Sequence, residues 1–297
     1  MFGIGINRIW NLKESQALNL FNRFVLFVFV VGVLGACTEQ GKQAAEPVPA
    51  HKSFTMESQE MKETRRITVY VPPQYSTSGS ETYPVLYMPD GGIHEDFPHL
   101  ATTIDTAIRA GEMQPVILVG VENTVRRRDM TGPTEVEEDR KVAPVIGGSE
   151  KFRAFFANEL IPHINAEYRV SDESGIIGES LAAYFIVEIL FLQPDLFDKY
   201  IALSPSIWWN DEEIVRKASE RLRKYPRLDA ELYLSSANEE DIYPAVQRLS
   251  EVLRRDAPVN LRWKYVPRPD LRHNNIYRTV SPTILRQMYP VAAAGEK

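Results

Sequence analysis

Short runs of apolar residues, rich in β-branched and aromatic side chains, recur along the chain and predict strands. Most are continuous rather than alternating, which is typical of strands buried on both faces of a parallel sheet. The run at 66–71 alternates more than the others, so we expect antiparallel strands at the N-terminal edge. The predicted strands lie at 66–71, 85–88, 115–121, 175–177, 199–203, 231–235 and 260–266.

Helical patterns separate these runs. The clearest covers 150–168, where apolar side chains from Phe152 to Ile164 recur at helical spacing. Strands that alternate with helices predict an α/β fold with a mostly parallel central sheet and helices on both faces. Ligands bind beyond the carboxyl ends of the strands in such sheets, so the loops that follow the strands are expected to carry the functional residues. The remaining predicted helices are 181–192, 211–224, 243–255 and 276–289.

The N-terminus carries an apolar run at 24–36, shorter than the roughly 18 residues of a membrane-spanning helix. It is typical of a signal-peptide core. The run ends in LGAC, which resembles the lipobox of bacterial lipoproteins, so 1–36 is expected to be a signal peptide and Cys37 the lipidated residue. An uncleaved anchor or a misplaced start is the alternative, because the segment before the run is long and contains Glu14.

These features predict a protein of the bacterial cell envelope that is lipid-anchored and faces the periplasm. Thr38, rather than aspartate, after the anchor favours the outer membrane by the sorting rule of some enteric bacteria. The polar residues 37–56 lack periodicity and suit a flexible tether, and 57–297 is expected to form one domain.

Composition and charge exclude several classes of protein. The chain has 297 residues, 44% hydrophobic and 25% charged, which argues against disorder and coiled coil. Its formal charge is −6, and a nucleic-acid partner is not expected because phosphate binding needs a surplus of Lys and Arg. One cysteine allows neither an intramolecular disulfide nor a cysteine-based zinc cluster, and no metal or cofactor is expected.

A candidate nucleophile lies where strand 175–177 meets helix 181–192. The junction reads GESLA, in which Gly178 and Ala182 are small enough for a tight turn that exposes Ser180. A helix N-terminus also stabilises developing negative charge. The alternative is that Ser180 only caps the helix.

A serine in this position needs a base, which α/β-hydrolases place late in the chain. His273 follows the last predicted strand and precedes the terminal helix, so it is the expected base. The other histidines lie in the tether, after an early strand or within a helix: His51, His94, His99 and His163.

The acid that orients the base should follow strand 231–235. Three consecutive acids stand there, and we favour Glu240, with Glu239 and Asp241 as alternatives. Acids ahead of a helix are also common as helix caps. The loop that carries the acid is therefore better defined than the choice among its three acids.

Two backbone amides should hold the oxyanion. One is the amide after the nucleophile, that of Leu181. The other is expected from Gly92 or Ile93, in the glycine-rich loop after strand 85–88.

Further residues on the same side of the sheet are candidates for binding substrate. Asp90 precedes the paired glycines, and Asn123 and Arg128 follow another strand, where a guanidinium could bind a carboxylate or phosphate. Trp208 and Trp209 follow the strand at 199–203. One of the two indoles could form a pocket wall, with core packing as the alternative.

The chain resembles the putative-esterase branch of the α/β-hydrolases, which includes enterochelin esterases, esterase D and feruloyl esterase modules. The resemblance covers roughly 60–290 and implies a serine hydrolase with Ser180, His273 and an acid near Glu240. Two departures are Ala182, where glycine is usual, and the sequence DLR before His273. The matching pieces are YPVLYMPDGG (83–92), PVILVGVENT with RRRDMTGPT (115–134), GIIGESLAAYF (175–185) and FDKYIALSPSIWW (197–209).

The expected activity is cleavage of small-molecule carboxylic esters through an acyl-enzyme on Ser180. Acyl transfer by the same residues is an alternative, as is a lipid-anchored binding protein that has lost turnover. Siderophore lactones, feruloyl-type esters, acetylated sugars and thioesters all fit the predicted fold.

Overall fold

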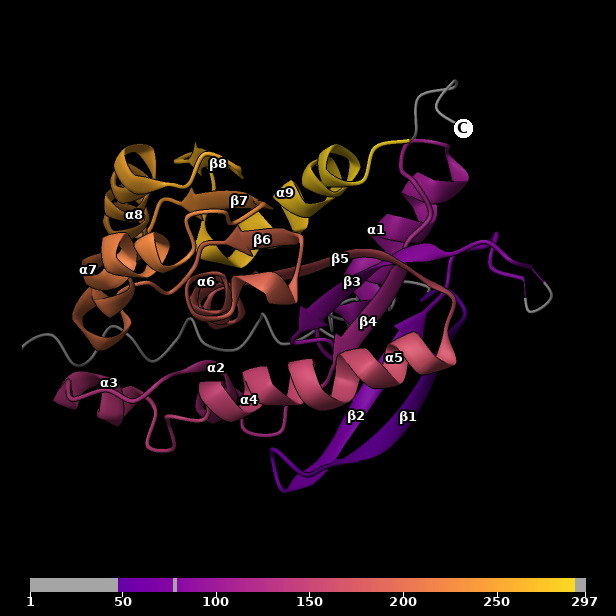
Figure 1. Cartoon of the computed structure of the whole chain (residues 1–297), viewed down its shortest axis with the longest axis horizontal. Helices are drawn as coiled ribbons and strands as arrows, with labels where there is room; N and C mark the ends of the chain where they lie inside the picture. The colour runs from indigo at the N-terminus through magenta and orange to yellow at the C-terminus, as the bar shows by residue number, and fades with distance from the viewer. Residues whose placement is uncertain (1–47, 77–78, 292–297) are drawn as a thin grey trace, which may run out of the picture. The chain divides into compact units, whose positions relative to one another are not determined.

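An eight-stranded sheet forms the centre of the computed structural model, which describes residues 48–76 and 79–291 (Figure 1). The strand order is β1-β2-β4-β3-β5-β6-β7-β8. β2 is antiparallel to both of its neighbours, whereas every pair from β4 to β8 is parallel. The predicted mostly parallel α/β fold with an antiparallel N-terminal edge is therefore confirmed. The strands are β1 His51–Ser58, β2 Glu63–Tyr70, β3 Tyr83–Pro89, β4 Ile117–Val121, β5 Val170–Glu179, β6 Lys199–Leu203, β7 Ala230–Ala237 and β8 Leu261–Arg268.

Helices pack on both faces of the sheet, and alternate residues of β3 show this division. Tyr87 lies in the hydrophobic cluster that contains residues of α4 and α6 to α8, whereas Leu86 and Met88 lie in the cluster with α1 and α9. The predicted helix 150–168 is one continuous run of α4, a π-helical turn (η1) and α5. The helices are α1 Phe97–Arg109, α2 Arg126–Met130, α3 Glu137–Val142, α4 Ser149–Phe155, η1 Phe156–Leu160, α5 Ile161–Glu167, α6 Leu181–Leu192, the 3-10 turn η2 Pro194–Leu196, α7 Trp209–Lys224, α8 Ile242–Asp256 and α9 His273–Met288.

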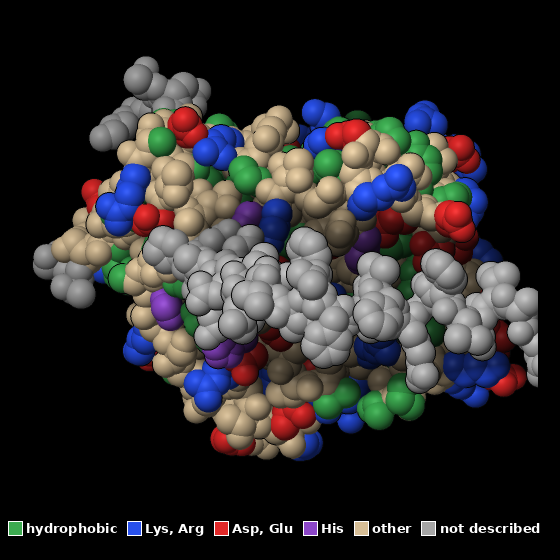
Figure 2. Space-filling model, turned by 180° about the vertical axis from the view of Figure 1, so that it is seen from behind, with side chains coloured by type: hydrophobic (Ala, Val, Ile, Leu, Met, Phe, Trp, Pro, Cys, Tyr) green, Lys and Arg blue, Asp and Glu red, His purple; other side chains and the backbone are tan. Residues whose placement is uncertain are grey.

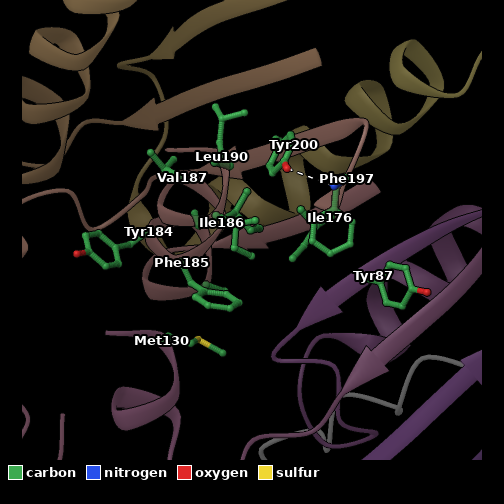
Figure 3. Packing of buried hydrophobic residues seen from close by; sticks show 14 of the residues in the cluster. Tyr87, Met130, Ile176, Tyr184, Phe185, Ile186, Val187, Leu190, Phe197 and Tyr200 are labelled. Atoms are coloured by element: carbon green, nitrogen blue, oxygen red, sulfur yellow. Dashed lines mark hydrogen bonds between the residues drawn. The ribbon is translucent and has the colours of Figure 1, made fainter. Parts of the chain in front are cut away.

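Helix α6 lies in the core and carries the candidate serine at its N-terminus. All its residues from Leu181 to Phe191 are buried, as a helix that is apolar on every side requires. Figure 3 shows Tyr184, Phe185 and Leu190 pointing away from this helix in different directions. Replacing a fully buried phenylalanine such as Phe185 by alanine typically costs about 3–5 kcal/mol, so the helix that presents Ser180 is held firmly.

The predicted tether, 37–56, extends at least six residues too far at its C-terminal end. Residues 51–56 belong to β1, which pairs with β2 along its whole length, from His51 opposite Tyr70 to Ser58 opposite Glu63. The strand lies at the sheet edge and is mostly exposed, so its backbone pairing leaves no strong apolar pattern.

The predicted signal peptide and lipidation residue Cys37 lie outside the described residues. Among the helices of the described residues, none has the length and apolar character needed to cross a membrane.

Candidate active site

Ser180 occupies a strained turn between β5 and α6. Its backbone has φ 60° and ψ −118°, a conformation that side chains other than glycine rarely adopt. The Ser180 amide donates to the carbonyl of Leu203, and the Ser206 amide donates to the carbonyl of Ser180. Such strain persists only where the surroundings enforce it and concentrates at functional sites.

The turn depends on small residues on both sides of Ser180. A Cβ on Gly178 would lie 2.8 Å from Cβ of Ala182, closer than real contacts allow, and at a tight 3.1 Å from Cδ1 of Ile186. Ala182 stands where glycine is usual, and its methyl group is fully buried. The turn has room for this methyl group because Gly178, opposite it, has no side chain. This is the geometry of a nucleophile elbow.

His273, the first residue of α9, contacts Glu239 in the loop after β7. Its Nδ1 lies 2.5 Å from Oε2 of Glu239. This nitrogen is buried and has no hydrogen-bond partner of regular angle in the described part of the chain, so the ion pair is the contact that orients the ring. The contact with Glu239 raises the pKa of His273, while burial acts in the opposite direction.

The favoured acid Glu240 is wrong as the partner of His273. Glu240 is exposed, and the exposed Asp241 uses its carboxylate to accept the Ile242 amide at the start of α8. Glu239, one of the two alternatives, points inward with a side chain only 11% exposed. Periodicity cannot distinguish three adjacent acids in a loop, because their directions depend on the turn.

Ser204 holds Glu239 in place, a role that the sequence analysis missed. Its Oγ donates to Oε1 of Glu239 at 2.7 Å and accepts the amide of Ala237 at 3.0 Å. Glu239 thus has one oxygen on Ser204 and the other on His273. The signal in the sequence was the position of Ser204 directly after β6, at the edge that carries the site.

The hydroxyl of Ser180 contacts Ser206, with 3.4 Å between the two Oγ atoms. No hydrogen bond joins it to His273 among the residues described here. Catalytic hydrogen bonds are often long without substrate and shorten in the complex, so the missing bond does not by itself exclude His273 as the base.

The two candidate oxyanion amides after β3 differ in their partners. The Gly92 amide donates to Oε2 of Glu95 at 2.7 Å, so it is occupied, which counts against Gly92. Ile93 remains the candidate from this loop. Leu181 is the first residue of α6, and an amide at that position has no acceptor within the helix.

Asp90 lies in a polar cluster beside these amides. Its carboxylate accepts two hydrogen bonds from Arg126, at 2.6 and 2.7 Å, and one from Nδ2 of Asn123. Asn123 also donates to Glu95. The structure thus brings together Asp90 and Asn123, two of the candidates for binding substrate, and adds Arg126 and Glu95 to the same cluster. Their role in binding substrate stays a prediction.

Arg128, the predicted substrate-binding arginine, lies in a different ion-pair cluster. It donates to both carboxylate oxygens of Glu63 and contacts Asp129, which in turn pairs with the fully buried Arg65. Burial raises the pKa of Glu63, but hydrogen bonds from Arg128, Thr124 and Arg65 lower it to about 2. Arg128 therefore ties α2 to β2, and Arg126 is the arginine beside Asp90.

The two tryptophans differ in burial. Trp209 is buried, and its indole N–H donates to the carbonyl of Gly132 at 3.2 Å. Trp208 is half-buried and packs against the hydrophobic cluster and the ring of Trp209, with 5.9 Å between the ring centroids. A role of Trp208 as a pocket wall stays a prediction.

The described part of the chain contains no metal-binding cluster. In residues 48–76 and 79–291, no group of three or more His, Cys, Asp or Glu side chains could hold a metal ion. Basic and acidic side chains are interspersed on the face in Figure 2.

Comparison with known families accounts for this geometry. The model of the family described as "Putative esterase" matches residues 58–280. The chain belongs to this esterase family. The matched range includes Ser180 in its tight turn, His273 and Glu239.

Several curated proteins are similar to this esterase-family chain. One is the ferri-bacillibactin esterase BesA of Bacillus subtilis, 29% identical over 61% of this chain and 66% of the relative. Another is the siderophore triacetylfusarinine C esterase of Aspergillus fumigatus, 39% identical over 31% of this chain and 32% of the relative. The chain thus spans two thirds or less of the curated relatives it matches.

Solved structures support the fold. An IroE-like serine hydrolase from Shewanella oneidensis superposes with a TM-score of 0.72 and 24% identity, over 81% of this chain and 80% of that one. The BES protein from Bacillus cereus superposes with a TM-score of 0.70 and 23% identity, over 80% of this chain and 94% of the other. At these identities the likeness establishes a shared fold.

Proposed function

We propose that the protein is a serine esterase in which Ser180 is the nucleophile, His273 the general base and Glu239 the acid. The observation that carries the proposal is the strained backbone of Ser180 at the start of α6. The His273–Glu239 contact supplies the second half of a triad at the same edge of the sheet.

The reaction proceeds in two stages. Ser180 Oγ attacks the ester carbonyl carbon while its proton passes to Nε2 of His273, and the carbonyl oxygen becomes an oxyanion held by the Leu181 and Ile93 amides. The C–O bond to the leaving alcohol then breaks, and His273 returns the proton to that alcohol. Water attacks the acyl-enzyme with His273 again as base, which releases the acid and restores Ser180.

Glu239 keeps the proton of His273 on Nδ1, so that Nε2 is free to accept the proton of Ser180. Its negative charge then stabilises the imidazolium that forms. Ser204 limits the ways in which Glu239 can turn, because it occupies the other carboxylate oxygen.

We propose a small-molecule ester as the substrate, with siderophore esters as the first class to test. The support is the naming of BesA and of the Aspergillus relative as siderophore esterases. Arg126 at the start of α2 offers a cationic side chain for such a ligand, and Trp208 directly before α7 offers an aromatic one.

The decisive experiment compares the native chain with Ser180→Ala. We expect hydrolysis of p-nitrophenyl esters and labelling by a fluorophosphonate probe in the native protein, and neither in the variant, with unchanged circular dichroism and melting. Undiminished turnover by the variant would overturn the assignment. A native protein that the probe does not label would favour the binding-protein alternative, and a transferred acyl product with an added alcohol would favour acyl transfer.

We also propose that Cys37 carries the lipid anchor in the cell envelope. The support is the apolar run at 24–36 that ends directly before this cysteine. Metabolic labelling with a radioactive fatty acid should mark the native chain and not Cys37→Ser.

A further inference from the structure

Glu179, the residue directly before the nucleophile, is a half-buried acid that the proposed mechanism does not use. It is the last residue of β5, opposite Leu203 of β6, so the strand ends fix its backbone beside that of Ser180. Its Oε1 atom is buried and has no hydrogen-bond partner among the described residues. A buried carboxylate oxygen without a partner is costly, and such atoms need an explanation.

The charged groups around Glu179 come from four elements. The strand ends place Glu179 in the same region as His273, because Glu179 lies opposite Leu203, the next residue Ser204 donates to Glu239, and Glu239 contacts His273. The other charged groups that act on Glu179 are Arg126 of α2 and Asp96 before α1. Arg126 is held by two hydrogen bonds to Asp90, and Glu239 is held by Ser204. The group near Glu179 whose charge changes during the proposed reaction is therefore His273.

We propose that Glu179 is a second carboxylate partner of His273: its negative charge stabilises the imidazolium that forms when Ser180 loses its proton, and its protonation withdraws that stabilisation. This inference rests on the proposed function for its catalytic consequence. Glu179 is a positioning residue that acts through His273 and sets the pH range of the reaction. The attraction between Glu179 and the His273 imidazolium needs no hydrogen bond, which agrees with the unpartnered Oε1 of Glu179.

The titration of the two groups supports this coupling. Burial is the main cause that raises the pKa of Glu179 to about 7, with Asp96 and Glu239 adding to it and His273 opposing it. The charge of Glu179 in turn contributes to raising the pKa of His273, after the larger contribution of Glu239. The charge states of the two groups are therefore coupled, because the charge of each one shifts the pKa of the other.

The test uses Glu179→Gln, which keeps the shape and removes the charge. In the purified full-length chain, we expect the NMR titration midpoint of His273, assigned with His273→Asn, to fall by about 0.5 to 1 pH unit. The acid limb of kcat/KM for a p-nitrophenyl ester should move by a similar amount to lower pH, and the plateau should fall about 3- to 10-fold.

Two further variants separate charge from structure. Glu240→Gln makes the same change at an exposed acid and should leave the midpoint, the limb and the plateau unchanged. Glu179→Asp should restore part of the midpoint shift because it restores the charge. A merely structural role for Glu179 would lower the rate at every pH without moving the limb.

The outcomes also separate this inference from the proposed function. A lower His273 midpoint in Glu179→Gln in a protein without turnover would uphold the coupling and overturn the esterase proposal. A midpoint and limb that stay at their native values in Glu179→Gln would overturn the coupling and leave the esterase proposal intact.

Discussion

Glu239, in the loop after β7, lies against His273 at the start of α9, with 2.5 Å between Oε2 and Nδ1. Glu239→Gln keeps the shape but removes the charge and can hold the wrong tautomer. We expect kcat/KM to fall on the order of 10³- to 10⁴-fold, as for other triads that lose their acid. The matched change Glu240→Gln should stay within twofold of native. Equal losses in both variants would refute the assignment of Glu239.

A second prediction concerns the space between Gly178 and Ala182. Gly178→Ala places a Cβ 2.8 Å from that of Ala182, so we expect a loss of about 1–3 kcal/mol in the free energy of unfolding in urea. Adding Ala182→Gly removes the nearest clash. The double variant should therefore lose less than the two single variants together, and strict additivity would contradict the packing argument.

The stability of the protein should depend on pH through Glu179. Its pKa is about 7 in the folded state against the usual 4.5, so the folded state binds this proton more tightly. The resulting stabilisation is complete below about pH 4.5 and is lost as pH rises through 7. The Glu179→Gln variant has no titrating group at this position and does not lose this stabilisation. The free energy of unfolding of the variant, relative to that of the native protein, should therefore rise by about 1–3 kcal/mol between pH 5 and 8. Denaturant titrations at both pH values test this, and a constant difference would contradict it.

The buried pair of Arg65 and Asp129 allows a fourth prediction. Both side chains are fully buried, with 2.6 Å between Nη1 and Oδ2. Asp129→Ala removes the fully buried partner of Arg65 and leaves only the partly exposed Glu63 to pair with it, so it should cost about 3–5 kcal/mol in denaturant unfolding. The double change Arg65→Met with Asp129→Leu should cost less.

An exposed pair provides the control for this effect. Lys141 and Glu137 lie 3.2 Å apart on the surface of α3. Glu137→Ala should change the free energy of unfolding by less than about 0.5 kcal/mol. A comparable loss at both sites would show that burial is not what makes the Arg65 pair costly to break.

Buried elements were predictable from the sequence because burial imposes a pattern. The strand at 199–203 and the helix at 181–192 have the bounds expected for them, since apolar side chains fill both elements. The edge strand β1 lacks that pattern, and its pairing with β2 depends on backbone hydrogen bonds that any residue can make.

The site was predictable to the level of loops. Ser180 and His273 stand where the order of strands and helices puts a nucleophile and a base. Choosing Glu239 over Glu240, or Arg126 over Arg128, requires the direction of each side chain. That direction depends on tertiary contacts, such as those of Ser204 and Asp90, that no local pattern contains.

The backbone of Ser180 is held by contacts from the ends of neighbouring strands, while His273 arrives some ninety positions later in the chain. The proposed site therefore cannot form before α9 has been synthesised. A nascent chain that still holds α9 inside the ribosome carries Ser180 without its proposed base, so the proposed hydrolysis has to wait until α9 has emerged.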